Sequence, residues 1–167
     1  MSSGFCSSLL TSIRGMHPAL NTALDADGDA LARGITGGPS LVKPNVRELE
    51  RLLKRSLPGM RAIKEAAGSL AARGVRYVLV TLGDAGAVCF SENKAVRVQG
   101  PRVVSQGAVG CGDAFLGGFV HALAVTGSFT ESVRYAAASG TAKAMMRGTA
   151  MPSPDDVKRV LRHIRIS

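Results

Sequence analysis

The sequence has 167 residues, of which 46% are hydrophobic, and this size and composition fit one globular domain and exclude a disordered chain. Lys and Arg outnumber Asp and Glu by 21 to 12, an excess that favours anionic ligands such as nucleotides, sugar phosphates or nucleic acid. Aromatic residues make up only 4% and are not interleaved with the basic residues, so a stacking surface for single strands is not expected. Nucleic acid is therefore not an expected partner.

Cysteine spacing and hydropathy bear on the location of the chain. Cys6, Cys89 and Cys111 are widely spaced without a C-x-x-C pair, which argues against a disulfide framework or zinc knuckle and favours a reducing cytoplasm. No apolar run approaches the roughly 18 residues that cross a bilayer, so no membrane partner is expected. Residues 1–20 are rich in serine, with Arg14 as their charged residue, and we expect a disordered leader, with an organellar transit peptide as the alternative.

From residue 21 onward, short apolar runs alternate with longer helical patterns, which predicts an α/β fold with a largely parallel sheet. The run Val75–Leu82 is mostly apolar and rich in β-branched residues, so we expect a central strand that is covered on both faces. The expected strands are 23–25, 40–42, 75–82, 87–90, 95–98 and 102–105, with a hairpin around Glu92 and Asn93. The expected helices are 28–33, 46–54, 59–73, 112–125, 130–146 and 154–164.

The segment Gly107–Phe119 carries the chemistry that is easiest to interpret. Gly110 and Gly112 let the backbone approach a ligand, and the helix that starts there has free N–H groups in its first turn, an arrangement that binds phosphate. Asp113 would then lie where a substrate hydroxyl meets a γ-phosphoryl group and could accept the hydroxyl proton. The alternative is a glycine-rich turn in which Asp113 only stabilises the helix dipole.

Four segments in one order resemble the ribokinase/PfkB carbohydrate kinase family. Val109–Phe119 is similar to the family signature G-A-G-D-x-F-x-x-G-F, with Cys111 where alanine or serine is usual. Leu41–Leu49 resembles K-P-N-x-x-E-L, and Val80–Ala87 resembles V-T-L-G-x-x-G. Leu24–Leu31 resembles the upstream stretch D-x-x-G-x-x-L. Four ordered matches are much more specific than any one of them.

The resemblance implies a partial fold. Residues 21–167 would be the carboxyl-terminal, ATP-binding half of a ribokinase-like, three-layer, Rossmann-like domain with a largely parallel central sheet. Family members are longer, and their amino-terminal half supplies much of the sheet, the sugar-binding residues and a small β lid. This chain is expected to lack that half and the lid.

The resemblance also implies an activity. ATP and Mg²⁺ would be the cofactors of a kinase that transfers the γ-phosphoryl group to a hydroxyl of a sugar or sugar phosphate. The K-P-N form and the V-G-x-G-D spacing resemble the phosphofructokinase/tagatose-6-phosphate kinase branch. The alternative is a truncated, inactive nucleotide-binding homologue, and the expected protein partner is a second copy of the chain or the missing amino-terminal half.

The catalytic residues implied by the resemblance lie in one loop. Asp113 would be the base, and the loop formed by Gly110, Cys111 and Gly112 would stabilise the transferred phosphoryl group. Cys111 has a second interpretation, because a helix N-terminus lowers a thiol pKa and favours a nucleophile. We do not favour it, because no histidine is a partner candidate in the sequence.

Metal and nucleotide contacts are implied in earlier segments. Asn45 and Glu48 would organise Mg²⁺ and its waters, and a helix cap of the capping-box type is the alternative for the same pair. Lys43 would direct positive charge toward phosphates, its alternative being a solvated lysine at a strand end. Ser139 lies in a stretch of small residues that we interpret mainly as helix packing, with an adenine contact at its edge. The full nucleotide set is Lys43, Asn45, Thr81, Gly83, Gly86 and Ser139.

Overall fold

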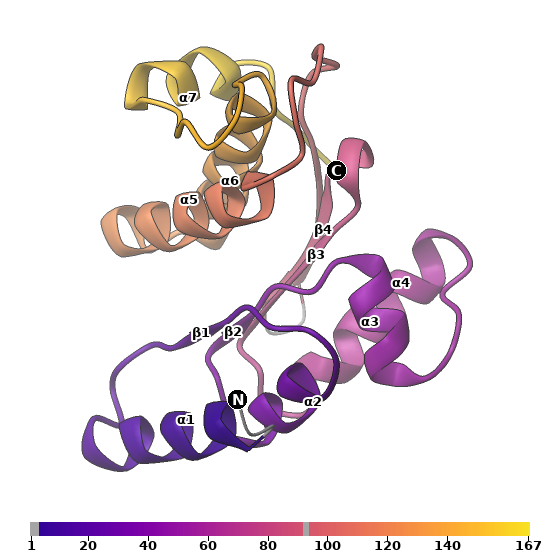
Figure 1. Ribbon diagram of the computed structural model, residues 1–167, viewed down its shortest axis with the longest axis vertical. Helices are drawn as coiled ribbons and strands as arrows, with labels where there is room; N and C mark the ends of the chain where they lie inside the picture. Colours follow the sequence, from indigo (N-terminus) through magenta and orange to yellow (C-terminus); the bar gives the residue numbers. More distant parts are fainter. Residues whose placement is uncertain (1–3, 92–93) are drawn as a thin grey trace. The chain divides into compact units, whose positions relative to one another are not determined.

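The computed structural model describes residues 4–91 and 94–167 (Figure 1). Its helices are α1 (Phe5–Met16), α2 (Gly28–Thr36), α3 (Val46–Leu53), α4 (Gly59–Ala71), α5 (Cys111–Thr126), α6 (Phe129–Ala144) and α7 (Pro154–Leu161). Its strands are β1 (Ala23–Leu24), β2 (Leu41–Val42), β3 (Tyr77–Thr81), β4 (Ala87–Ser91), β5 (Lys94–Gln99) and β6 (Arg165–Ile166), hydrogen-bonded in that order. Two compact units result: the first is Met1–Leu82 with Val88–Ala95, and the second is Gly83–Ala87 with Val96–Ser167.

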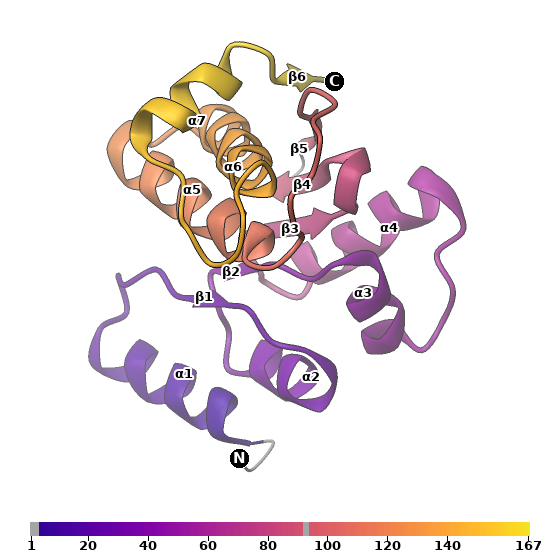
Figure 2. The same ribbon diagram turned by 45° about the horizontal axis from the view of Figure 1, so that its top comes forward.

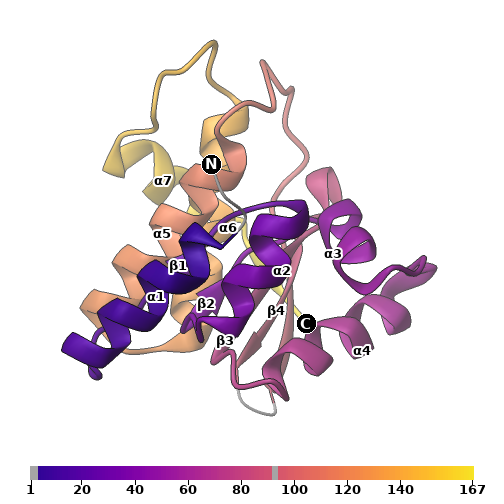
Figure 3. The same ribbon diagram turned by 60° about the horizontal axis from the view of Figure 1, so that its bottom comes forward.

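The first unit is built on a parallel sheet. Leu24 of β1 pairs with Val42 of β2, and Val42 pairs with Val78 of β3. Helix α4 packs against β3, and α1 lies beside α2 (Figure 3). The α4 residues predicted to face the core are all buried: Ile63, Ala66, Ala67 and Leu70. The α/β expectation is therefore confirmed, and β3 is the fully covered strand that its apolar run predicts.

The second unit contains a helical group, in which α6 packs against both α5 and α7 (Figure 2). Helices α5 and α6 come very close, because a Cβ on Gly118 would lie 2.4 Å from the Ser139 hydroxyl and one on Gly140 would lie 3.3 Å from the Cys111 carbonyl oxygen. A side chain on Gly118 would therefore force the two helices to shift, and one on Gly140 would need a shift of a few tenths of an ångström. Val98 of β5 pairs antiparallel with Ile166 of β6.

Helix ends follow their local chemistry. Ser153 caps α7, with Pro154 at the first position and Asp156 completing a capping box. Gly127 ends α5 in the left-handed conformation, with φ of 65°. These polar ends satisfy backbone groups that a helix leaves unpaired, which explains why the expected and observed boundaries of α7 and α5 nearly agree at these ends.

Two expectations about irregular segments are wrong. The expected disordered leader contains α1, whose Leu10 is buried and whose Arg14 donates a hydrogen bond to the Gly38 carbonyl oxygen at 3.3 Å. Residues 102–105 form no strand; β6, which was not predicted, pairs with the neighbouring β5 instead. The hairpin turn predicted at residues 92–93 lies outside the described residues. In the part of the chain described, no helix has the length and apolar character that a bilayer crossing requires.

Candidate functional site

The segment that follows β2 forms a capped helix start in the first unit. Asn45 is the N-cap of α3, and its Oδ1 accepts a hydrogen bond from the Glu48 backbone N–H at 3.0 Å. The Glu48 carboxylate accepts from the Asn45 backbone N–H at 2.9 Å and from its side-chain amide at 2.6 Å. The capping-box interpretation of this pair is therefore confirmed.

The same donor set bears on a divalent cation. Each Glu48 oxygen and the Asn45 oxygen already accepts one N–H, which leaves further lone pairs on half-buried atoms. Mg²⁺ commonly keeps several waters and is held through few carboxylates. The pair therefore fits contact with Mg²⁺ through its waters. Among the described residues, no group of three or more His, Cys, Asp or Glu side chains is placed to hold a metal ion.

Lys43 is buried at the end of β2. Its side chain is 8% exposed, and its Nζ lies 3.1 Å from the Asp25 carboxylate, which follows β1. The parallel strands β1 and β2 are neighbours and end at the same edge of the sheet. Asp25 and Lys43, which directly follow them, therefore lie side by side. The alternative of a solvated lysine is wrong. The positive charge of Lys43 is paired within the protein, which reduces what it can direct toward a phosphate.

Thr81 joins this cluster from β3. Its backbone N–H donates to the Pro44 carbonyl oxygen at 3.1 Å, and an isolated parallel bridge connects it to Asn45. The carboxyl ends of parallel strands are where open α/β sheets bind ligands. The structure therefore gathers four of the predicted residues at one edge of the first unit: Lys43, Asn45, Glu48 and Thr81.

Gly83 and Gly86 belong to a tight turn in the second unit. Gly83 starts a 3-10 turn with φ of 63°, and space around its Cα is open. Gly86 has φ of 93°, and a Cβ there would lie 2.0 Å from the Val98 carbonyl oxygen. Gly86 is thus required by close backbone packing, whereas Gly83 leaves room for an approaching group.

The expected phosphate loop lies at the start of α5. Gly110 is the N-cap with φ of 79°, and no side chain caps this end. The first turn of a helix carries N–H groups without intrahelical partners and the positive end of the dipole. Asp113 lies in this first turn and is exposed. The loop therefore has the backbone form of an anion site, with a carboxylate beside it.

Cys111 does not have the features of a nucleophile. Burial raises the pKa of its thiol, and the nearby Lys143 ammonium offsets that effect only in part. The Sγ lies 3.6 Å from the Gly107 carbonyl oxygen, as a weak donor. Desolvation is thus the larger of the two effects on this thiol, which agrees with the nucleophile interpretation not being favoured.

Ser139 packs between helices. It is 5% exposed, and its hydroxyl donates to the Tyr135 carbonyl oxygen at 2.9 Å. The hydroxyl also lies where a Cβ on Gly118 would clash, at 2.4 Å. These contacts favour helix packing over a nucleotide contact for this residue.

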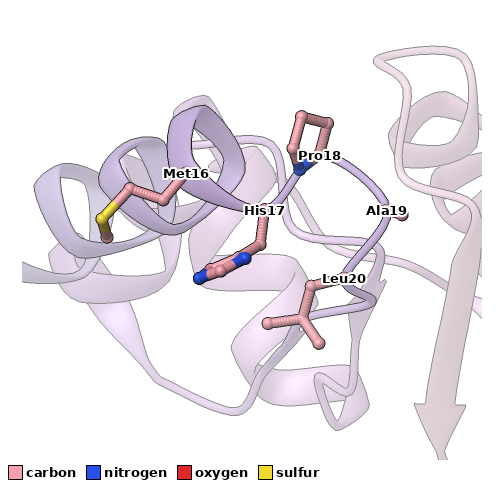
Figure 4. A pocket seen from close by; sticks show the side chains of 5 residues that line it. All are labelled: Met16, His17, Pro18, Ala19 and Leu20. Carbon is pink, nitrogen blue, oxygen red and sulfur yellow. The ribbon is translucent and has the colours of Figure 1, made fainter.

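A shallow surface hollow follows α1, and Figure 4 shows the side chains that line it. The lining residues are Met16, His17, Pro18, Ala19 and Leu20. His17 is exposed. None of the predicted site residues lines this hollow, so it does not locate the phosphate chemistry.

Two functional features were missed by sequence reasoning. Asp25 was assigned to a motif without its role as the partner of Lys43, although the D-x-x-G stretch contained it. Lys143 was not singled out at all, yet it is 1% exposed and lies beside Gly110. A lysine between Ala142 and Ala144, in an otherwise small-residue stretch, is the signal that could have identified it.

Residues 10–156 match the sequence pattern described as pfkB family carbohydrate kinase. The chain belongs to this family. It is 35% identical over 144 residues to a 1-phosphofructokinase of Rhodobacter capsulatus, covering 86% of this chain and 46% of that relative. It is 34% identical over 143 residues to the ATP-dependent 6-phosphofructokinase isozyme 2 of Escherichia coli strain K12, covering 84% and 46%.

Solved structures agree with the family assignment. The chain resembles phosphofructokinase-2 from Escherichia coli in complex with substrates and products, with a TM-score of 0.90, 30% identity, and coverage of 97% of this chain and 52% of that one. The ribokinase-like fold class is therefore confirmed. The chain spans about half the length of the relatives it matches.

Proposed function

We propose that the chain carries the ATP-binding, phosphoryl-transfer part of a carbohydrate kinase, with a phosphorylated ketose as acceptor. The observation that carries the proposal is the uncapped start of α5, where Gly110 turns the backbone and Asp113 lies in the first turn. Membership of the pfkB family and relatives that are phosphofructokinases support the reaction class and the acceptor.

Asp113 has the base role in this proposal. Its carboxylate takes the proton of the acceptor hydroxyl as that oxygen attacks the γ-phosphoryl group. The N–H groups that begin α5, in the loop of Gly110, Cys111 and Gly112, stabilise the negative charge on the phosphoryl oxygens. Cys111 would contribute through its backbone N–H, which donates to the Ala108 carbonyl oxygen at 3.3 Å in this structure, and not through its thiol, whose pKa is raised by burial.

ATP and Mg²⁺ are the proposed cofactors. When bound, Mg²⁺ neutralises the charge that develops on the phosphates. Asn45 and Glu48 would hold the metal, directly or through its waters, with the lone pairs that their capping box leaves free. Thr81, which the bridge to Asn45 fixes, and the open turn at Gly83 complete the proposed nucleotide contacts. Lys43 and Gly86 support these segments from within the protein.

The domain assignment follows from the length comparison. We assign residues 21–167 to the carboxyl-terminal half of a ribokinase-like kinase domain, because the four ordered motifs resemble those of that half, and the matched relatives are covered over only 46% of their length. Substrate positioning contributes much of a phosphoryl transferase's rate. A second function therefore competes: a nucleotide-binding module that lacks catalysis by itself and depends on a second polypeptide, either another copy or the complementary half.

Acceptor phosphorylation tests the proposal. Purified chain is given Mg²⁺ and γ-labelled ATP with fructose 1-phosphate, fructose 6-phosphate or tagatose 6-phosphate. Asp113→Ala is measured beside Asp29→Ala, which removes an exposed first-turn acid from α2 and so controls for the helix dipole. Labelled product with the wild type and Asp29→Ala, but not with Asp113→Ala, supports the kinase. ATP binding without product from any of the three proteins supports the module.

A further inference from the structure

Lys143 of α6 is a buried cation in the second unit. It is 1% exposed, although lysine is almost never fully buried without a partner. Its Nζ donates a hydrogen bond to the Gly148 carbonyl oxygen at 2.8 Å, in the segment that follows α6. An ammonium carries three donors, and one neutral carbonyl offsets only part of the cost of burying its charge. The burial of this lysine therefore needs a further reason.

Its position beside α5 supplies one. A Cβ on Gly110 would lie 3.1 Å from Lys143 Cε and 4.0 Å from Nζ, so the end of the side chain lies next to the N-cap. The start of α5 carries the partial positive charge of the helix dipole. A full positive charge has thus been placed beside a partial one. These like charges repel each other, and an anion bound at the same helix end would interact favourably with both. The arrangement is therefore suited to a phosphate.

Backbone and side-chain bonds connect the same two segments. The Gln106 backbone N–H donates to the Ala144 carbonyl oxygen at 2.7 Å, and Arg147 Nε donates to the Gln106 side chain at 3.3 Å. The segment before α5 is therefore tied to the end of α6 and the residues after it. Lys143 lies at this junction, with its stem against Gly110 and its ammonium on Gly148.

We propose that Lys143 is a positioning residue for the α5 loop. Its ammonium holds the segment after α6 through the Gly148 carbonyl oxygen and adds positive charge next to Gly110. The inference rests on the proposed function, in which this loop holds the transferred phosphoryl group. Lys143 acts through Gly110 and touches no reacting atom.

Two substitutions separate charge from packing. Lys143→Gln keeps a side-chain N–H donor and removes the charge, whereas Lys143→Ala leaves space beside the Gly148 carbonyl for a small cation. Lys158→Gln removes an equal charge from the exposed face of α7 and is the control. Mg·ATP affinity is measured by calorimetry, and amide exchange of peptides 105–116 and 144–150 is measured without nucleotide. Both measurements on Lys143→Ala are repeated in ammonium chloride and in tetramethylammonium chloride of equal ionic strength.

Lys143→Gln should weaken ATP binding about tenfold, the scale of one charge at a partly buried helix end, and Lys158→Gln should leave it unchanged. Lys143→Ala should exchange faster in both peptides, and ammonium, but not tetramethylammonium, should restore protection. ATP binding by Lys143→Gln equal to wild type, or equal effects of the two salts, would overturn the inference. If the wild type does not bind ATP, the proposed function fails, and the exchange measurement still decides the role of Lys143. If Lys143→Ala does not fold, exchange in Lys143→Gln decides it.

Discussion

Asn45 caps α3, and we propose that it also holds waters of Mg²⁺; a matched pair of substitutions separates the two roles. Asn45→Ala removes the oxygen that accepts from the Glu48 N–H at 3.0 Å. Loss of such a cap costs about 1 kcal/mol of unfolding free energy, within a range of about 0.5–2. Ser153→Ala is the control, because Ser153 forms the same capping box with Asp156 at the start of α7. Both variants should therefore lose similar stability.

The assay measures both properties in the same proteins. Urea denaturation gives the unfolding free energy, and calorimetric titration of ATP at increasing MgCl₂ gives the metal dependence of nucleotide affinity. Asn45→Ala should require several-fold more Mg²⁺ for half-maximal ATP affinity, whereas Ser153→Ala should match the wild type. An unchanged Mg²⁺ dependence in Asn45→Ala, at the expected loss of stability, would refute the metal role and leave the cap as the only function of Asn45.

Three further predictions follow from single contacts. Gly86→Ala should lower the unfolding free energy by more than about 2 kcal/mol, because residue 86 has a positive φ and its Cβ would lie 2.0 Å from the Val98 carbonyl oxygen of β5. A melting temperature within about 2–3 °C of wild type corresponds to a much smaller loss and would contradict this. Asp25→Asn should lower the unfolding free energy, measured by denaturant titration, by about 1–2 kcal/mol, because it leaves Lys43 buried without its anion. In a Lys43→Met background, Asp25→Asn should be nearly neutral. Additive losses in the double variant would contradict the pairing. Hydrogen bonds from Ser153 hold the pKa of Asp156 below the usual value for an aspartate. The stabilising effect of this carboxylate is therefore full above that usual value and is lost as pH falls through the lower folded pKa. Acid titration of stability should show this loss in wild type and a smaller one in Ser153→Ala.

Local chemistry made much of the fold predictable. Asn45 and Ser153 mark helix starts by their side-chain oxygens, and the apolar run of β3 reports a strand covered on both faces. These signals act over a few residues, so the sequence carries them directly. Gly110 was predicted to let the backbone approach a ligand, and its φ of 79° is a conformation that glycine adopts freely.

Features that depend on distant partners were not predictable in the same way. β6 forms because Ile166 pairs with Val98 of β5. Helix α1 is held by contacts that include the hydrogen bond from Arg14 to the Gly38 carbonyl oxygen. The burial of Lys143 depends on the close seating of α5 on α6, which no local pattern reports. The raised pKa of the Cys111 thiol has a related cause, since its desolvation comes from packing that the local sequence does not show.

The central claim is that Asp113, at the start of α5, is the base of a phosphoryl transfer. Its most direct test is the single-turnover rate of γ-phosphoryl transfer to fructose 1-phosphate at saturating Mg·ATP, for wild type and Asp113→Asn, with the ATP dissociation constant measured on the same samples. The account predicts a rate at least about 100-fold lower in Asp113→Asn at an unchanged dissociation constant, the scale of general-base catalysis. Equal rates in the two proteins would contradict it.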